Sequence, residues 1–124
     1  MTIVVGYVPK PEGEAALDKA IEEALLRDTE LVVVHSHRAR ADEDEPDLTA
    51  VHERLEQSGV THEVRQLVRG FEAAEDLVSV AESHDAELIV IGLRRRTPVG
   101  KLILGSNAQR VLLDAHCPVL AVKA

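Results

Sequence analysis

The sequence has few aromatic residues, one cysteine and no long apolar run. Aromatic side chains make up 2% of the 124 residues, so aliphatic residues must form the core, and a stacking platform for single-stranded nucleic acid is excluded. Cys117 has no second cysteine with which to form an internal disulfide. No apolar run reaches the ~20 residues of a membrane helix. No charged-then-apolar leader opens the chain. We therefore expect a cytoplasmic protein with no membrane partner.

Positive charge is also scarce. The sequence has 14 Lys and Arg against 22 Asp and Glu, a net charge of −8, which does not favour nucleic acid as a partner. The acidic run at residues 42–45 is interpreted as a solvated loop, because consecutive carboxylates lack the spacing of a calcium loop. His35 and His37 lack a third converging ligand, so we predict no metal site and expect both at the wet end of a strand.

Short aliphatic runs alternate along the chain with segments of helical period. The runs cover residues 2–8, 31–35, 62–68, 88–91 and 118–122. Strands that alternate with helices predict one α/β domain over residues 1–124, with a doubly wound five-stranded parallel sheet of order 3-2-1-4-5 and helices on both faces. In this order a ligand lies outside the carboxyl ends of strands 1 and 4, and the third run lies near an edge.

The segment that follows the fourth run is suited to an anion. It leaves the strand at Gly92, passes the basic residues 94–96 and Lys101, and enters a helix at Gly105-Ser106. The free N–H groups of a helix start hold oxyanions, and glycine lets a phosphate approach the main chain. The alternative interpretation is a plain turn and helix cap. The glycine patterns of a dinucleotide-binding fold and of a P-loop are both absent.

Several segments, taken in order and spacing, resemble the universal stress protein family over essentially the whole chain. They are residues 3–6, 12–17, 31–35, 85–92, 105–106 and 116–122. The resemblance implies a Rossmann-like fold of the adenine nucleotide alpha hydrolase type that binds ATP or AMP, with or without Mg²⁺. It also implies a stress-response role.

The resemblance also implies a set of nucleotide-binding residues. Gly92 would lie near the ribose or phosphates, Gly105, Ser106 and Asn107 around the phosphates, and the main chain of Val34 against the adenine.

The chain departs from the family pattern at two positions. Arg95 stands where the family motif has its middle glycine, and Val8 stands where the family commonly has an acidic residue. Arg95 either obstructs the pocket or clamps a phosphate. We expect the two departures to weaken nucleotide binding.

No residue in the sequence pairs a general base with a nucleophile, so we expect a binding protein without catalytic residues. Two alternatives stay open: a nucleotide-free interaction module, and a slow ATP hydrolase, for which Val8 occupies the obvious place of a metal-binding carboxylate. The last run is apolar and has no following element to cover it, which predicts a homodimer through this edge. The residues of that edge are Pro118, Val119, Leu120, Ala121 and Val122.

Overall fold

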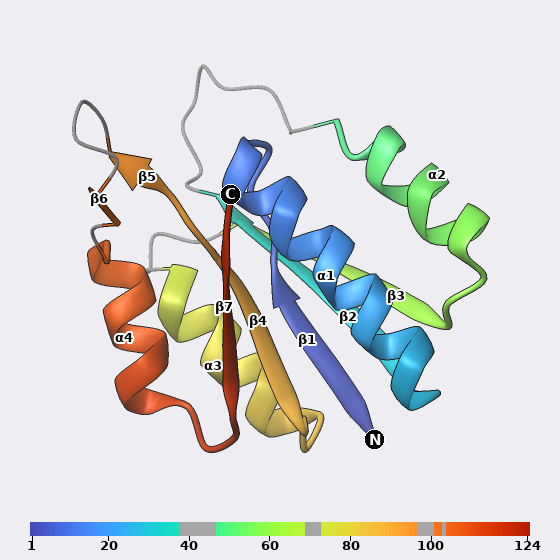
Figure 1. The fold of residues 1–124 in the computed structure, drawn as a ribbon. Helices are drawn as coiled ribbons and strands as arrows, with labels where there is room; N and C mark the ends of the chain where they lie inside the picture. The colour runs from blue at the N-terminus through green and yellow to red at the C-terminus, as the bar shows by residue number, and fades with distance from the viewer. Residues whose placement is uncertain (38–46, 69–72, 97–100, 103) are drawn as a thin grey trace.

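The computed structural model describes residues 1–37, 47–68, 73–96, 101–102 and 104–124, and its main sheet has five parallel strands in the order β3-β2-β1-β4-β7 (Figure 1). The strands of this sheet are β1 (Thr2–Gly6), β2 (Glu30–His37), β3 (His62–Val68), β4 (Leu88–Leu93) and β7 (Val119–Lys123). The helices are α1 (Pro11–Arg27), α2 (Thr49–Ser58), α3 (Ala73–Ser83) and α4 (Ser106–Asp114). The predicted fold class and strand order are confirmed, including the edge position of β3.

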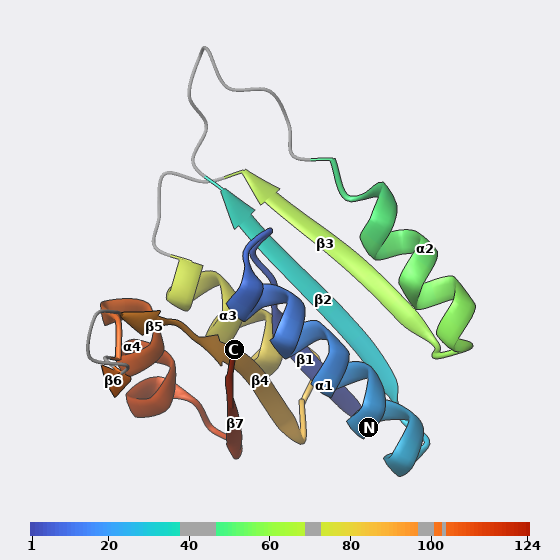
Figure 2. The ribbon, with the colours of Figure 1, turned by 45° about the horizontal axis from the view of Figure 1, so that its top comes forward.

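Helices cover both faces of the sheet and so create two aliphatic cores. Side chains alternate along a strand, so Ile3 and Val5 of β1 face α1 and α2, whereas Val4 faces α3 and α4. All three are completely buried. Figure 2 shows α1 and α2 on the face opposite α3 and α4. Burial on both faces explains why the central runs are continuously apolar.

Helix α1 begins and ends on recognisable signals. Pro11 occupies the first helical turn, and Glu12 and Glu14 complement the positive end of the helix dipole. The chain leaves the helix at Asp28, which adopts the left-handed conformation with φ 53°. These signals place the first turn of α1 directly after the end of β1.

The structure differs from the sequence-based expectations at three places. β1 ends at Gly6 rather than at Val8, and in the turn that follows the N–H of Lys10 donates to the carbonyl of Val8. The basic segment after β4 contains an additional antiparallel pair, β5 (Arg95–Arg96) with β6 (Lys101–Leu102), which the sequence did not predict. His35 is 4% exposed, and its Nδ1 lies 3.0 Å from the carbonyl oxygen of Tyr7, so its predicted place at the wet end of the strand was also wrong.

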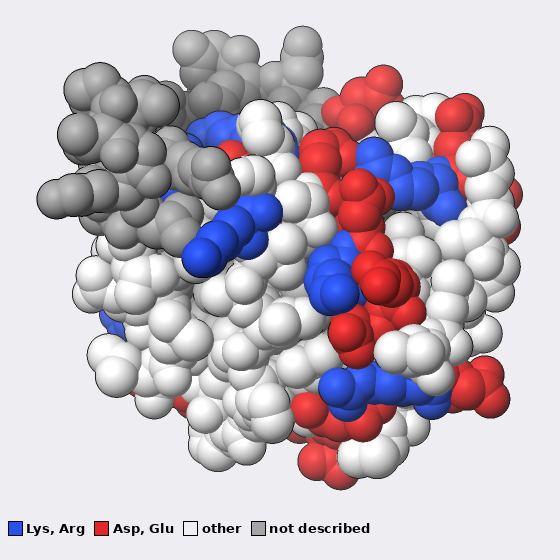
Figure 3. Space-filling view, viewed as in Figure 1, with Lys and Arg blue, Asp and Glu red and all other residues white. Residues whose placement is uncertain are grey.

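Charged side chains gather over α1 and α2, whereas the view over β7 and α4 is largely free of them (Figure 3). Among the described residues, no helix combines the length and apolar character needed to cross a membrane. The acidic run at residues 42–45 lies outside the described residues.

Candidate functional site at the carboxyl ends of β1 and β4

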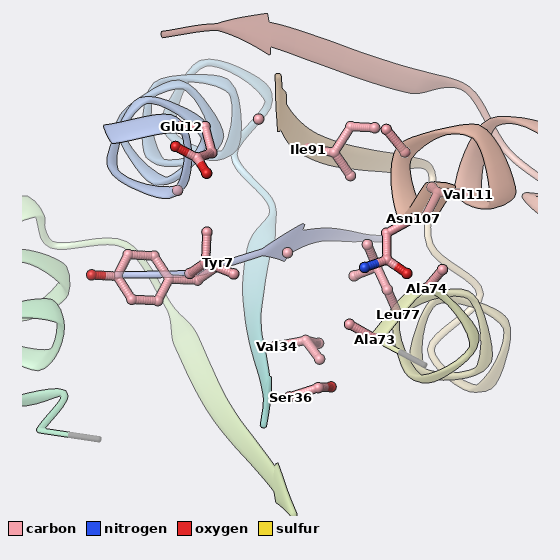
Figure 4. Close-up of a pocket in the computed structure, with 15 residues that line it drawn as sticks. Tyr7, Glu12, Val34, Ser36, Ala73, Ala74, Leu77, Ile91, Asn107 and Val111 are labelled. Carbon is pink, nitrogen blue, oxygen red and sulfur yellow. The ribbon is translucent and has the colours of Figure 1, made fainter. Parts of the chain in front are cut away.

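A cleft opens where the carboxyl ends of β1 and β4 meet the first turns of α1 and α4 (Figure 4). We divide it into an inner lobe, which reaches β2 and α3, and an outer lobe, which reaches Lys10, Arg94 and Gly105. The two lobes share a wall. That wall consists of Val8, Glu12, Gly92, Asn107 and Ala108. The inner lobe has a cavity volume of about 140 Å³ and is open to solvent at its mouth.

The inner lobe is mainly apolar. Its lining includes Val34 of β2, Leu77 of α3 and Ile91 of β4, each of which is buried. Ser36 also lines this lobe, and its hydroxyl oxygen is buried with no hydrogen-bond partner in the described part of the chain. The lobe therefore suits a flat, largely apolar group that carries a polar edge.

The outer lobe brings two basic side chains to a helix start. Lys10 and Arg94 are exposed, and Gly105 directly precedes the first residue of α4. Gly105 has φ −69°, an ordinary value for any residue, and a methyl group built there would meet no described atom within 4 Å. The fold therefore does not require glycine at this position, and the open space leaves the main chain accessible to an anion.

Gly92 and Gly13 have a different reason to be glycine. A Cβ atom at Gly92 would lie 1.9 Å from the carbonyl oxygen of Glu12, and one at Gly13 would lie 1.8 Å from the carbonyl oxygen of Val8. Both glycines let α1 start tightly against the ends of β1 and β4. The same packing places Glu12 on the wall between the two lobes, and Figure 4 shows it at the start of α1 beside the pocket.

Tyr7 joins the cleft to a polar chain beneath α1. Its hydroxyl donates a hydrogen bond to the Glu14 carboxylate at 2.6 Å, and Arg54 of α2 donates to the same carboxylate. Burial and the hydrogen bond to Glu14 raise the pKa of Tyr7 to about 12. The hydrogen bond from Tyr7 lowers the pKa of Glu14, with a further contribution from Arg54. This chain fixes the end of β1 relative to both helices on that face.

Most of the residues expected at the site from the sequence line this cleft. Val34 lines the inner lobe, Gly105 lines the outer lobe, and Gly92 and Asn107 line both. Ser106 is the first residue of α4 but is not among the lining residues. The backbone of Arg95 lies in β5, while its side chain, like those of Arg96 and Lys101, lies outside the described part of the structure.

The main chain of Val34 is already used by the sheet. Its carbonyl accepts a hydrogen bond of 2.9 Å from the N–H of Tyr7, and the pairing of β1 with β2 ends at this residue. β2 continues to His37, with Ser36 paired to β3. Ser36 therefore lies beyond the end of β1, on the same side of its strand as Val34.

Sequence reasoning missed Ser36, Lys10 and the position of Glu12 in the cleft. One signal was present in the sequence, because Ser36 interrupts the apolar alternation of Val32 and Val34.

Metal-ligating side chains do not converge in the described residues, where no group of three His, Cys, Asp or Glu is close enough to hold an ion. Cys117 is partly buried against the α3–α4 core, and burial raises the pKa of its thiol.

Comparison with known proteins gives one consistent result. The model of the universal stress protein family matches residues 1–123. A universal stress protein of Mycolicibacterium smegmatis is 49% identical over 126 residues, which cover 98% of this chain and 96% of that protein.

Solved structures from Archaeoglobus fulgidus are similar in both sequence and fold. One universal stress protein is 40% identical with a TM-score of 0.79, and the match covers 99% of this chain and 98% of that one. Another, solved in complex with dAMP, is 34% identical with a TM-score of 0.73 over the same shares of the two chains. The chain therefore belongs to the universal stress protein family.

Proposed function

We propose that this protein binds an adenine nucleotide, ATP or AMP, in the cleft between β1 and β4, and that it acts through the bound or free state rather than by catalysis. The observation that carries the proposal is the polarity of the cleft. An apolar inner lobe for a base adjoins an outer lobe where Lys10, Arg94 and the open start of α4 converge. A nucleotide likewise has a flat, largely apolar base at one end and anionic phosphates at the other.

The residues of the cleft fit the ligand along its length. The base enters the inner lobe beside Val34 and Leu77, and the phosphates lie against the Gly105 main chain in the outer lobe. The ribose lies between them, at the shared wall that contains Glu12 and Gly92. The Archaeoglobus fulgidus relative solved with dAMP supports this ligand class.

The direct test is to identify what the purified protein carries. Native mass spectrometry and analysis of released bases should find adenine nucleotide, or calorimetry should show that added ATP or AMP binds. We predict that the departures from the family pattern at Val8 and Arg95 weaken the affinity. The titration should therefore extend to millimolar ligand, since a millimolar Kd corresponds to ~4 kcal/mol of binding free energy. Absence of binding at that concentration would favour the nucleotide-free interaction module.

A slow ATP hydrolase is the second candidate, and Glu12 is the observation in its favour. Hydrolysis requires a carboxylate for Mg²⁺ near the phosphates, and Glu12 reaches the outer lobe although Val8 does not supply one. Magnesium-dependent release of phosphate that disappears in Glu12→Gln, with ATP binding retained, would support this candidate. Binding without turnover would support the first.

We also propose that the protein forms a homodimer through the outer edge of β7. Val119, Leu120, Ala121 and Val122 are each only partly buried, and β7 is the last strand of the sheet. Figure 3 shows few charged side chains over this strand. An edge strand with outward main-chain groups pairs readily with a second copy, and the one charged residue of β7, Lys123, is its last.

A further inference from the structure

We propose that the Ser36 hydroxyl is a specificity-determining group, which recognises the polar edge of the base that enters the inner lobe. The inference rests on the proposed function and names a contact that the resemblance to the family did not imply.

The first observation is the position of Ser36 in the sheet. Side chains of β2 alternate, so Val32, Val34 and Ser36 point toward the same face, where α3 packs. Val32 and Val34 are buried in the α3–α4 core. Figure 4 shows Ser36 on the side of α3, near Ala73. Ser36 thus places one hydroxyl at the end of an otherwise aliphatic row.

The second observation is that this hydroxyl has no partner in the described structure. Its oxygen is buried from water and forms no hydrogen bond with any described residue. The α3 residues that line the same lobe are Ala73, Ala74 and Leu77, whose side chains offer no donor or acceptor. A buried hydroxyl without a partner destabilises the fold, so the structure provides no folding reason for serine here.

The third observation is which part of the ligand comes within reach. The phosphate-binding features belong to the outer lobe, and Ser36 lines only the inner one. The heterocycle is the part of a nucleotide that fits an apolar lobe, and its edge carries both donors and acceptors. A serine hydroxyl both donates and accepts, and rotation about χ1 turns it toward a polar atom brought into the lobe.

The experiment compares AMP with ribose 5-phosphate, which lacks the base. Calorimetry measures AMP, and displacement of a fluorescent adenine nucleotide measures ribose 5-phosphate. Ser36→Ala should bind AMP about tenfold more weakly than the wild type, with the affinity for ribose 5-phosphate unchanged. The ligand-free variant should melt at the same or a higher temperature, because its core no longer holds an unpaired hydroxyl.

Ser36→Thr and Ser36→Val form a matched pair, since the two side chains have the same shape and only threonine carries a hydroxyl. Threonine should bind AMP more tightly than valine. Equal binding by this pair, or a Ser36→Ala variant that weakens both ligands equally, would overturn the proposal while nucleotide binding itself stands. A wild-type protein that binds no AMP would instead refute the proposed function and this inference with it.

Discussion

Two glycines that belong to the same family pattern have different physical roles in this protein. Gly92 is enclosed by the Glu12 main chain, so its missing side chain is required for α1 to pack on the sheet. A Cβ built at Gly105 meets no described residue within 4 Å, so in the described structure its missing side chain is required only if something approaches the main chain from outside. Two glycines that the sequence pattern does not distinguish therefore differ in role: Gly92 is required for packing, and Gly105 is a candidate contact for a ligand.

Gly92→Ala and Gly105→Ala should separate these roles. Gly92→Ala should lower the free energy of unfolding by about 1–3 kcal/mol or more, because its methyl group has no room beside Glu12. Gly105→Ala should change that free energy by less than about 0.5 kcal/mol and should weaken nucleotide binding. Urea unfolding and calorimetry on both variants provide the measurements. A strongly destabilised Gly105→Ala protein would contradict this division.

Glu12 provides a second test at the residue scale. We expect its carboxylate to accept a hydrogen bond from the ribose 2′-hydroxyl, because it lies on the wall between the lobes for base and phosphate. The wild type should then bind AMP about tenfold more tightly than dAMP, and Glu12→Ala should bind the two nearly equally.

Glu12→Gln is the matched control, since its amide oxygen still accepts a hydrogen bond. It should retain part of the preference for AMP. An AMP-to-dAMP affinity ratio that is the same in the wild type and in Glu12→Ala would rule out this contact.

At the scale of elements, one polar chain ties β1, α1 and α2 together. Tyr7 at the end of β1 donates to Glu14 of α1, and Arg54 of α2 donates to Glu14 and also to Asp18 at 2.8 Å. The ion pairs of Arg54 are partly exposed, and such pairs contribute little to stability. Tyr7 is buried, with 5% exposure. We therefore expect its hydrogen bond to Glu14 to be the interaction of this chain whose contribution to stability changes with pH.

The pKa of Tyr7 is raised from 10.0 to about 12, so the free energy of unfolding should decrease at alkaline pH. The folded state holds the phenolic proton more tightly than the unfolded state, so this contribution is complete below pH 10 and is lost as pH rises toward about 12. Tyr7→Phe should remove that alkaline decrease in the free energy of unfolding.

Tyr7 is the sole tyrosine and the chain has no tryptophan, so ultraviolet absorbance of the tyrosinate follows this one group. Its midpoint should fall from about 12 in the folded protein to the ordinary value of 10.0 in urea. A folded-state midpoint at the ordinary value would refute the role assigned to the Glu14 hydrogen bond.

At the scale of the whole molecule, the proposed homodimer depends on the outer edge of β7. The carbonyl of Pro118 accepts a hydrogen bond from the N–H of Ile89, and the N–H of Ala124 donates one to the carbonyl of Leu93. The main-chain N–H and C=O groups of the even-numbered residues of this strand therefore point toward β4. The main-chain groups of Val119, Ala121 and Lys123 consequently face outward, where a second copy would pair.

Ala121→Pro should convert the dimer into a folded monomer, because proline removes an outward N–H and leaves the bonds to β4 in place. Leu120→Pro is the control, since it removes an inward N–H and should lower stability as well. Light scattering at micromolar concentration measures the assembly and thermal melting measures the fold. A wild-type monomer, or an Ala121→Pro protein that stays dimeric, would contradict a dimer through this edge.

The sequence alone determined the architecture of this protein. Apolar runs such as Ile3–Val5 and residues 88–91 must be buried on both faces, and helical segments between them leave few connections other than the observed parallel order. That order in turn predicted the cleft at β1 and β4. The same order therefore predicts that the glycines and the start of α4 lie near the site.

Only the tertiary structure decided how the cleft is lined. The contact of Glu12 with Gly92 and the extension of β2 beyond β1 depend on how separate elements pack, and side-chain periodicity carries no information on that. His35 shows the same limit, because its burial depends on the Tyr7 carbonyl 28 residues away in sequence. The sequence specifies which faces are apolar, whereas the positions of the few polar groups that line the cleft follow from long-range packing.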